Sequence, residues 1–171
     1  MLGKIIWLTG LSGSGKTTLS KSLYSKLIKL NFKVKRIDGD DFRKRNKIKN
    51  NFSRKNIYQN NISIIKNILR IQKKYNFIIV SVISPLLKTR MMSKKIFGKK
   101  YIEVYVKCGL RSLFKRDTKN LYKLAKKGFI KNLIGYNSKI IYEKSKYKKV
   151  LIDTEKENIH NSTKKILLKT L

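Results

Sequence analysis

One short loop near the start of the chain has the residue types that bind phosphate. It runs from Gly10 to Thr17, reads GLSGSGKT and fits the pattern G-x-x-x-x-G-K-[ST]. Glycine lets the backbone curl until successive N–H groups point at phosphate oxygens, and a helix that begins at the loop adds the partial positive charge of its N-terminus. Lys16 is expected to reach the β and γ phosphates and act in catalysis, and the Thr17 hydroxyl to bind Mg²⁺. The expected nucleotide-binding residues are Gly10, Ser12, Gly13, Ser14, Gly15, Lys16, Thr17 and Thr18.

A cluster of acidic residues is the second candidate for chemistry. Three of the nine acids, Asp38, Asp40 and Asp41, fall within four positions in the stretch RIDGDDFRKR. A phosphate-binding loop of this kind is expected to work with a carboxylate at the end of another strand. Asp38 is the candidate Mg²⁺ ligand, and either Asp38 or Asp40 is the candidate acceptor for the proton of an attacking hydroxyl. The competing interpretation is a plain turn, because Asp-Gly is a common turn dipeptide.

Strand-like and helical segments alternate along the chain and must position these residues. Five runs rich in Ile or Val have the pattern of strands covered on both faces, namely Lys4–Thr9, Lys33–Asp38, Phe77–Val82, Tyr101–Val106 and Lys149–Asp153. Helical patterns are found in Gly15–Leu30, Asn56–Tyr75, Pro85–Phe97, Gly109–Arg116, Leu121–Lys127 and Asn158–Leu168. The alternation predicts an α/β fold with a five-stranded, mostly parallel sheet and helices on both faces. Ligands of such sheets bind beyond the C-terminal ends of the strands, where the loop and the acids fall.

The length of 171 residues suits one domain with a substantial core, and the sequence shows no linker or repeat. No apolar run approaches the roughly 20 residues needed to cross a membrane, and no signal peptide is recognised. Cys108 is the only cysteine, so no internal disulfide can form. These observations predict a cytoplasmic protein. No Cys/His cluster has metal-ligand spacing, so Mg²⁺ carried by the nucleotide is the only metal expected.

The charge balance is extreme. Lys and Arg total 43 and Asp and Glu total 9, which gives a net charge of +34. Such a field attracts nucleic acid. The excess, however, is mostly Lys spread along the chain, and Lys, Asn and Ile all have A/T-rich codons, so we favour drift in a biased genome as its origin. We therefore expect anionic small substrates, salt-sensitive binding and only non-specific contact with nucleic acid.

From about Lys4 to Thr154 the chain resembles the adenylylsulfate kinase (APS kinase) family of P-loop kinases. The matching segments are WLTGLSGSGKTTLS, DGDDFR, FS followed by Asn60, SVISP, YIEVYV, KRDTKNLYKLAKKG and VLIDT. The resemblance implies one kinase domain over residues 1–171, with a lid in its C-terminal half. It also implies ATP- and Mg²⁺-dependent phosphorylation of the 3′-hydroxyl of adenosine 5′-phosphosulfate, which gives 3′-phosphoadenylyl sulfate and ADP in sulfate assimilation. A homodimer and a functional link to an ATP sulfurylase are the partners that it implies.

The resemblance also assigns roles to individual residues. Arg116 is similar to the residue that packs on the adenine of ATP, and Phe52 is similar to the one that stacks on the adenine of the acceptor. Lys119 and Leu121 belong, with Tyr122, to the lid that closes over both nucleotides. The acceptor-binding residues that the resemblance implies are Asp40, Arg43, Phe52, Asn60, Ile83, Ser84, Lys119 and Leu121.

Ser84 has two interpretations. The matching serine of the family is described as a phosphoenzyme intermediate, which makes Ser84 a candidate catalytic residue. Direct in-line transfer, however, needs only positioning and charge neutralisation, and a neutral hydroxyl here has no evident base beside it. The alternative is a backbone turn at Ser84-Pro85 that shapes the pocket.

The chain departs from the family pattern on the acceptor side. Ile57 stands at a family Arg, Ile62-Ser63 stands at an Arg pair, and Leu133-Ile134 stands at Phe-Thr. Loss of an Arg at an anion contact removes an interaction worth about 2 kcal/mol. Two alternatives therefore stay open. One is a kinase of the same fold with a different nucleotide conjugate or small anion as acceptor. The other is a basic nucleic-acid-binding protein that uses the loop as a switch.

Overall fold

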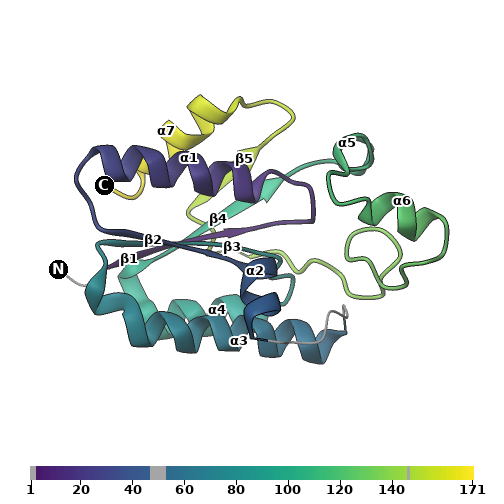
Figure 1. The fold of residues 1–171 in the computed structure, drawn as a ribbon, viewed down its shortest axis with the longest axis horizontal. Helices are drawn as coiled ribbons and strands as arrows, with labels where there is room; N and C mark the ends of the chain where they lie inside the picture. Colours follow the sequence, from purple (N-terminus) through teal and green to yellow (C-terminus); the bar gives the residue numbers. More distant parts are fainter. Residues whose placement is uncertain (1–2, 47–52, 146) are drawn as a thin grey trace.

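Five short apolar strands form one parallel sheet in the order β2-β3-β1-β4-β5 (Figure 1). In the computed structural model, which describes residues 3–46, 53–145 and 147–171, they are β1 (Lys4–Thr9), β2 (Val34–Asp38), β3 (Phe77–Val82), β4 (Tyr101–Lys107) and β5 (Val150–Asp153). All four pairings between these strands are parallel. The predicted α/β class and five-stranded sheet are confirmed, and the strand bounds differ from the predicted ones by a single residue at β2, β4 and β5.

The central strand β1 is apolar on both faces because helices cover both. Ile6 and Leu8 are fully buried in one core cluster, and Ile5 and Trp7 are fully buried in the cluster on the opposite face. Full burial of one such side chain contributes about 2 kcal/mol to the hydrophobic stabilisation. This burial on both faces explains why the strands appear in the sequence as continuous apolar runs.

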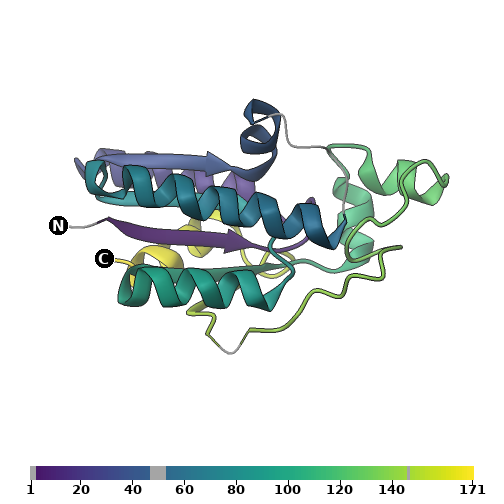
Figure 2. The ribbon, with the colours of Figure 1, turned by 90° about the horizontal axis from the view of Figure 1, so that it is seen from below.

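Two helical layers enclose the sheet (Figures 1 and 2). One layer holds the first and the last helix of the chain, and the other holds two helices from its middle. The first layer is α1 (Lys16–Lys29) and α7 (Ile159–Leu168), and the second is α3 (Arg54–Ile71) and α4 (Leu87–Phe97), followed by the 3₁₀ turns η1 (Gln72–Lys74) and η2 (Gly98–Lys100). Helices on both faces were predicted, although α4 begins two residues after the predicted Pro85.

One short helix, α2 (Gly39–Arg45), was not predicted. Its N-cap is Asp38, whose carboxylate accepts a hydrogen bond from the N–H of Asp40 over 3.0 Å. Acidic residues in its first turn and basic residues in its last turn suit the helix dipole. The interpretation of Asp38-Gly39 as a plain turn is therefore wrong, because this dipeptide starts a helix.

The chain between β4 and β5 forms a lobe beside the C-terminal ends of the strands (Figure 1). The lobe begins with α5 (Leu110–Arg116) and α6 (Leu121–Lys126) and continues as irregular chain. Leu113, Tyr122 and Leu133 form its small buried core. The lobe lies where the lid implied by the family resemblance is expected, beside the C-terminal ends of the strands. In the described part of the chain, no helix is long and apolar enough to cross a bilayer.

Candidate active site

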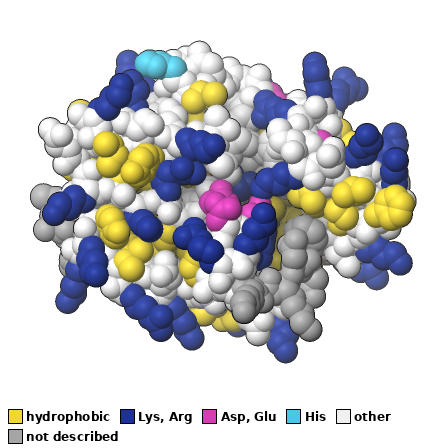
Figure 3. Space-filling model, in the orientation of Figure 1, with side chains coloured by type: hydrophobic (Ala, Val, Ile, Leu, Met, Phe, Trp, Pro, Cys, Tyr) yellow, Lys and Arg dark blue, Asp and Glu magenta, His cyan; other side chains and the backbone are white. Residues whose placement is uncertain are grey.

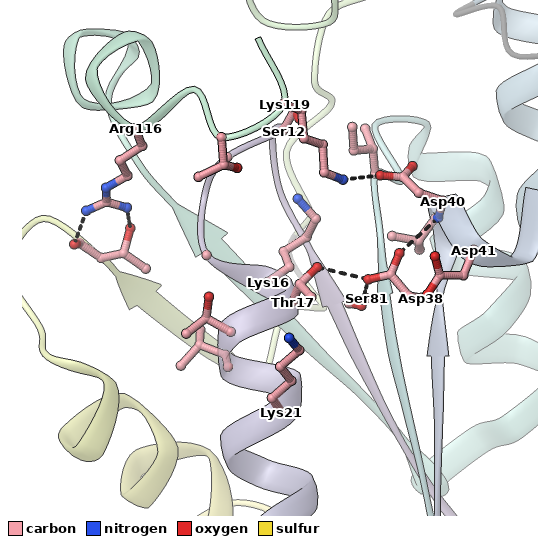
Figure 4. Close-up of a pocket in the computed structure, with 18 of the residues that line it drawn as sticks. Ser12, Lys16, Thr17, Lys21, Asp38, Asp40, Asp41, Ser81, Arg116 and Lys119 are labelled. Atoms are coloured by element: carbon pink, nitrogen blue, oxygen red, sulfur yellow. Dashed lines mark hydrogen bonds and ion pairs between the residues drawn. The ribbon is translucent and has the colours of Figure 1, made fainter. Parts of the chain in front are cut away.

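A cleft of about 1330 Å³ opens at the C-terminal ends of the strands, between the loop after β1, the helix α2 and the α5–α6 lobe (Figure 4). This is the edge of the sheet at which parallel α/β folds bind ligands. The described residues that line it and bear on the argument are Ser12, Gly13, Gly15, Lys16, Thr17, Thr18, Arg36, Asp38, Asp40, Arg43, Ser81, Ile83, Arg116, Lys119, Leu121 and Thr154.

The phosphate-binding loop has the backbone that its glycines allow. Gly10, Gly13 and Gly15 have φ angles of 154°, 74° and 96°, which residues with a Cβ rarely adopt. A Cβ on Gly10 would also lie 2.3 Å from the carbonyl oxygen of Val106. No side chain caps the N-terminus of α1, so its first N–H groups remain available to an anion. The predicted strand–loop–helix context is confirmed.

Lys16, near the end of the phosphate-binding loop, is buried against the earlier residues of that loop. Its Nζ donates hydrogen bonds to the carbonyl oxygen of Leu11 over 2.5 Å and to the hydroxyl of Ser14 over 3.4 Å. Burial, followed by the positive charge of Lys119, lowers the pKa of Lys16 to about 7, and the Asp38 carboxylate acts in the opposite direction. A phosphate that enters the loop would restore the charge on this amine.

The Asp38 carboxylate is fixed by contacts from three elements. Its Oδ2 accepts hydrogen bonds from the Thr17 hydroxyl of α1 over 2.9 Å and from the Ser81 hydroxyl of β3 over 3.0 Å. Its Oδ1 caps α2. The Thr17 and Asp38 oxygens therefore lie together at the start of α1 (Figure 4), and hydroxyl and carboxylate oxygens are the ligand types that Mg²⁺ prefers.

Asp40 stands between two cations. One carboxylate oxygen is paired with Arg43, one turn later in α2, and the other is paired with Lys119 of the α5–α6 lobe. The second pair crosses the cleft and joins the lobe to α2 (Figure 4). Burial lowers the pKa of Arg43, and the nearby Asp38 carboxylate raises it. A carboxylate beside a phosphate site can aim a hydroxyl and take its proton once an anionic group draws the two cations away from it.

Arg116 lies on the other side of the phosphate-binding loop from Asp40 (Figure 4). It donates hydrogen bonds to the hydroxyl of Thr154 over 2.8 Å and to the carbonyl oxygen of Thr154 over 2.7 Å. These bonds hold the guanidinium beside the end of β5, and a planar guanidinium is a group that can stack on a base. The cleft thus extends from the phosphate-binding loop in two directions, toward Arg116 and toward Asp40.

The lobe is fastened to the phosphate-binding loop as well. The Tyr122 hydroxyl donates a hydrogen bond to the carbonyl oxygen of Ser12 over 3.0 Å. Asp117 accepts hydrogen bonds from the N–H groups of Tyr122 and Lys123 and so orients the start of α6. Because Tyr122 is fully buried, burial raises the pKa of its phenol, and the hydroxyl keeps its proton for this bond.

The charge around the cleft is positive. Figure 3 shows acidic side chains near the middle of this face with Lys and Arg side chains gathered around them. Lys21, Arg36 and Lys44 also line the cleft. A field of this sign raises the local concentration of anions.

The structure brings together most of the predicted site residues, but two of the predicted acceptor-binding residues lie away from the cleft. Asn60 and Ser84 are fully buried and do not line the cleft, and the Ser84 hydroxyl is hydrogen-bonded to that of Thr89. This burial favours the turn interpretation of Ser84 over direct catalysis. Phe52 lies outside the described residues. Two contacts in the cleft were missed, those of Ser81 and Thr154, although Ser81 is the penultimate residue of a predicted strand and Thr154 directly follows another.

Comparison with protein-family models gives one family. The model described as "Adenylylsulphate kinase" matches residues 2–153. The probable adenylyl-sulfate kinase of Archaeoglobus fulgidus is 36% identical over 154 residues, which cover 90% of this chain and 97% of the relative. That of Pyrococcus abyssi is 37% identical over 156 residues, covering 91% and 88%.

Comparison with solved structures also finds an APS kinase. The APS kinase of Mycobacterium tuberculosis, in complex with AMPPNP and APS, is similar with a TM-score of 0.90 and 25% identity, over 98% of this chain and 97% of that one. A gluconokinase of Sinorhizobium meliloti has a TM-score of 0.66 at 13% identity, covering 98% and 91%, which is a likeness of fold alone.

Proposed function

This chain belongs to the adenylylsulphate kinase family, and we propose that it transfers the γ-phosphoryl group of ATP to the 3′-hydroxyl of adenosine 5′-phosphosulfate. The products are ADP and 3′-phosphoadenylyl sulfate. The observation that carries the proposal is the placement of Asp40 beside the phosphate-binding loop, between Arg43 and Lys119. This arrangement provides a proton acceptor and two cations for an anionic alcohol in one cleft.

ATP fits the residues on the loop side of the cleft. The glycine-dependent curl of the loop, the uncapped N-terminus of α1 and the Lys16 amine would hold its β and γ phosphates. The Thr17 hydroxyl and the Asp38 carboxylate would hold Mg²⁺, which neutralises phosphate charge when it is bound. Arg116, anchored on Thr154, would stack on the adenine.

The acceptor fits the side of the cleft formed by α2 and β3. Its hydroxyl oxygen forms a bond to the γ-phosphorus as the bond from that phosphorus to the β–γ bridging oxygen breaks, and its proton passes to Asp40. Arg43 and Lys119 would bind its phosphosulfate. Ile83 and Leu121 line the cleft and would contact the nucleoside, as would Phe52.

The lobe would act as a lid. Lys119 and Tyr122 tie it to α2 and to the loop, respectively. Closure over two bound nucleotides would exclude water from the γ-phosphate and so suppress hydrolysis of ATP.

We extend the proposal to the setting of the enzyme. From its family we expect one kinase domain over residues 1–171, a homodimer in the cytoplasm, and a substrate supplied by an ATP sulfurylase. Sedimentation of the purified protein, with a monomer mass of 20.1 kDa, distinguishes a dimer from a monomer or a higher assembly.

Release of ADP with adenosine 5′-phosphosulfate as acceptor is the test of the function. We expect turnover by the wild type and its loss in Lys16→Ala and Asp40→Asn. A panel of other nucleotide conjugates and small anionic alcohols serves as the comparison. Preferred turnover of one of these would replace the acceptor, and turnover that survives Asp40→Asn would remove that residue from the mechanism.

A further inference from the structure

A glutamate in the irregular part of the lobe contacts the turn after β3, the start of α4 and the start of α3. The N–H of Glu143 donates a hydrogen bond to the carbonyl oxygen of Pro85 over 3.0 Å. Its carboxylate accepts one from the N–H of Leu87, the first residue of α4, over 2.5 Å. The other carboxylate oxygen lies 3.3 Å from the guanidinium of Arg54, the first residue of α3. A single side chain thus ties the starts of α3 and α4 to the segment 139–145, which we call the strap.

The carboxylate of Glu143 caps the N-terminus of α4. The N-cap of that helix is Leu86, which offers no side-chain hydrogen bond to the first N–H groups. Glu143 accepts a hydrogen bond from one of these N–H groups, and its negative charge suits the helix dipole. The start of α4 therefore depends on the position of the strap.

Arg90 fixes the same turn from inside. Its side chain is only 1% exposed and lies 3.3 Å from the buried carboxylate of Glu103 on β4. The guanidinium donates one hydrogen bond to the carbonyl oxygen of Ser84 and another to that of Glu143. The turn after β3 and the strap are thus held by one rigid group, and Ile83, the residue before this turn, lines the cleft.

The strap also reaches the residue that precedes the phosphate-binding loop. The ring of Tyr142 lies 5.3 Å from the Arg90 guanidinium, and its hydroxyl is hydrogen-bonded to the hydroxyl of Thr9. Tyr142 packs against a cluster of Ile57, Leu86 and Ile134. These contacts place the strap behind the wall of the acceptor side rather than in the cleft, because neither Tyr142 nor Glu143 lines it.

We propose that Glu143 is a positioning residue for the acceptor, which acts by holding the turn at residues 83–87 and the start of α3 in place. This inference rests on the proposed function. It assigns to Glu143 an effect on the acceptor and not on ATP, since the contact of the strap with Thr9 is made by Tyr142, whereas the Glu143 carboxylate contacts Leu87 and Arg54. A small displacement of a substrate-positioning wall is enough to change the kinetic constants.

Steady-state kinetics on the intact protein test this. In Glu143→Ala we expect the KM for adenosine 5′-phosphosulfate to rise about tenfold while the KM for ATP stays within about twofold. Glu143→Gln, which keeps an acceptor oxygen for Leu87, should show a smaller rise. Glu155→Gln is the matched control, because the Glu155 carboxylate accepts a backbone hydrogen bond from Gly109, over 2.9 Å, away from the acceptor side. Equal rises in both constants, or none in Glu143→Ala, would overturn the proposal.

Amide hydrogen exchange gives a readout that does not need turnover. We expect faster exchange of the Leu87 N–H and of residues 54–60 in Glu143→Ala, and wild-type exchange there in Glu155→Gln. If the wild type does not use adenosine 5′-phosphosulfate, the proposed function fails, and unchanged exchange in Glu143→Ala would then sink this inference separately. If exchange rises in a wild-type enzyme that is active but its KM for the acceptor does not, Glu143 has a purely structural role and the proposal fails.

Discussion

The Thr17 hydroxyl donates a hydrogen bond to the Asp38 carboxylate over 2.9 Å. The two residues are distant in the sequence, one at the start of α1 and the other at the end of β2. Their contact joins the phosphate-binding loop to the strand that carries the acidic cluster, and Ser81 supports it from β3. The chemistry proposed for the cleft depends on this junction.

Replacing Asp38 tests the junction. We expect Asp38→Asn to lower kcat by about 100-fold and to raise the Mg²⁺ concentration that gives half-maximal rate, because an amide is a weaker ligand for a hard cation. A magnesium titration of ADP release measures both. Asp153→Asn is the control, because Asp153 also ends a strand but pairs with Lys107 outside the cleft. An unchanged magnesium requirement in Asp38→Asn would contradict the assignment.

The pKa of Lys16 predicts a proton linked to ATP binding. In the free protein the amine titrates at about pH 7, and bound triphosphate favours its charged form. Binding above pH 7 therefore takes up a proton, and affinity falls as pH rises from 7 toward 9. Calorimetry of Mg-ATP binding at pH 8, in two buffers of different ionisation enthalpy, counts the protons. Lys16→Arg should abolish the uptake, since arginine stays charged throughout. Equal uptake in that variant would assign the proton elsewhere.

The glycine at the start of the loop predicts a contrast between two alanine variants. Gly10→Ala forces a Cβ to within 2.3 Å of the Val106 carbonyl, at a φ of 154°, so we expect ATP binding to be lost. Gly128→Ala has a φ of 81° with open space around the new Cβ, and should cost only about 1 kcal/mol of folding free energy. Nucleotide binding and urea unfolding, measured on both, separate the effects. Full ATP affinity in Gly10→Ala would refute the expectation.

Tyr122→Phe removes the hydrogen bond between the lobe and the carbonyl oxygen of Ser12. A buried acceptor without its donor costs about 1–3 kcal/mol, so we expect lower stability and a raised KM for ATP. Tyr24→Phe, on the exposed side of α1, controls for the loss of a hydroxyl. Wild-type kinetics and stability in Tyr122→Phe would show that the bond does not couple the two elements.

The net charge of +34 predicts salt dependence. Added NaCl, from about 50 to 300 mM, should raise the KM for both anionic nucleotides because it screens the field around the cleft. The effect on kcat should be smaller, since bound substrates are held by direct contacts. A KM that does not respond to salt would show that the distributed lysines do not affect binding.

The sequence predicted the sheet and the phosphate side of the cleft well. Strands buried on both faces give continuous apolar runs, and a loop whose shape requires Gly10 and Gly15 has a recognisable spacing. Asp38 could be placed near the loop because the C-terminal ends of parallel strands meet at one edge. The order of the strands follows from tertiary packing and could not be obtained from local patterns.

The acceptor side was harder to predict. Asp38-Gly39 has the composition of a turn, and only the capping geometry makes it a helix start. The strap has no periodicity, so the contacts of Glu143 with Pro85 and Leu87 have no sequence signal. Asn60 matched a motif and is fully buried. Motif matching finds residue types, whereas the burial of each residue follows from tertiary packing.

The double pairing of Asp40 with Arg43 and Lys119 has a consequence for wasteful ATP consumption. A neutral water molecule has no charge with which to draw those two cations away from the carboxylate, whereas the anionic groups of an incoming acceptor do. On the proposed mechanism, the displacement that seats the acceptor would also free Asp40 to take its proton. The enzyme would then discriminate between alcohol and water by charge before any bond to phosphorus begins to form.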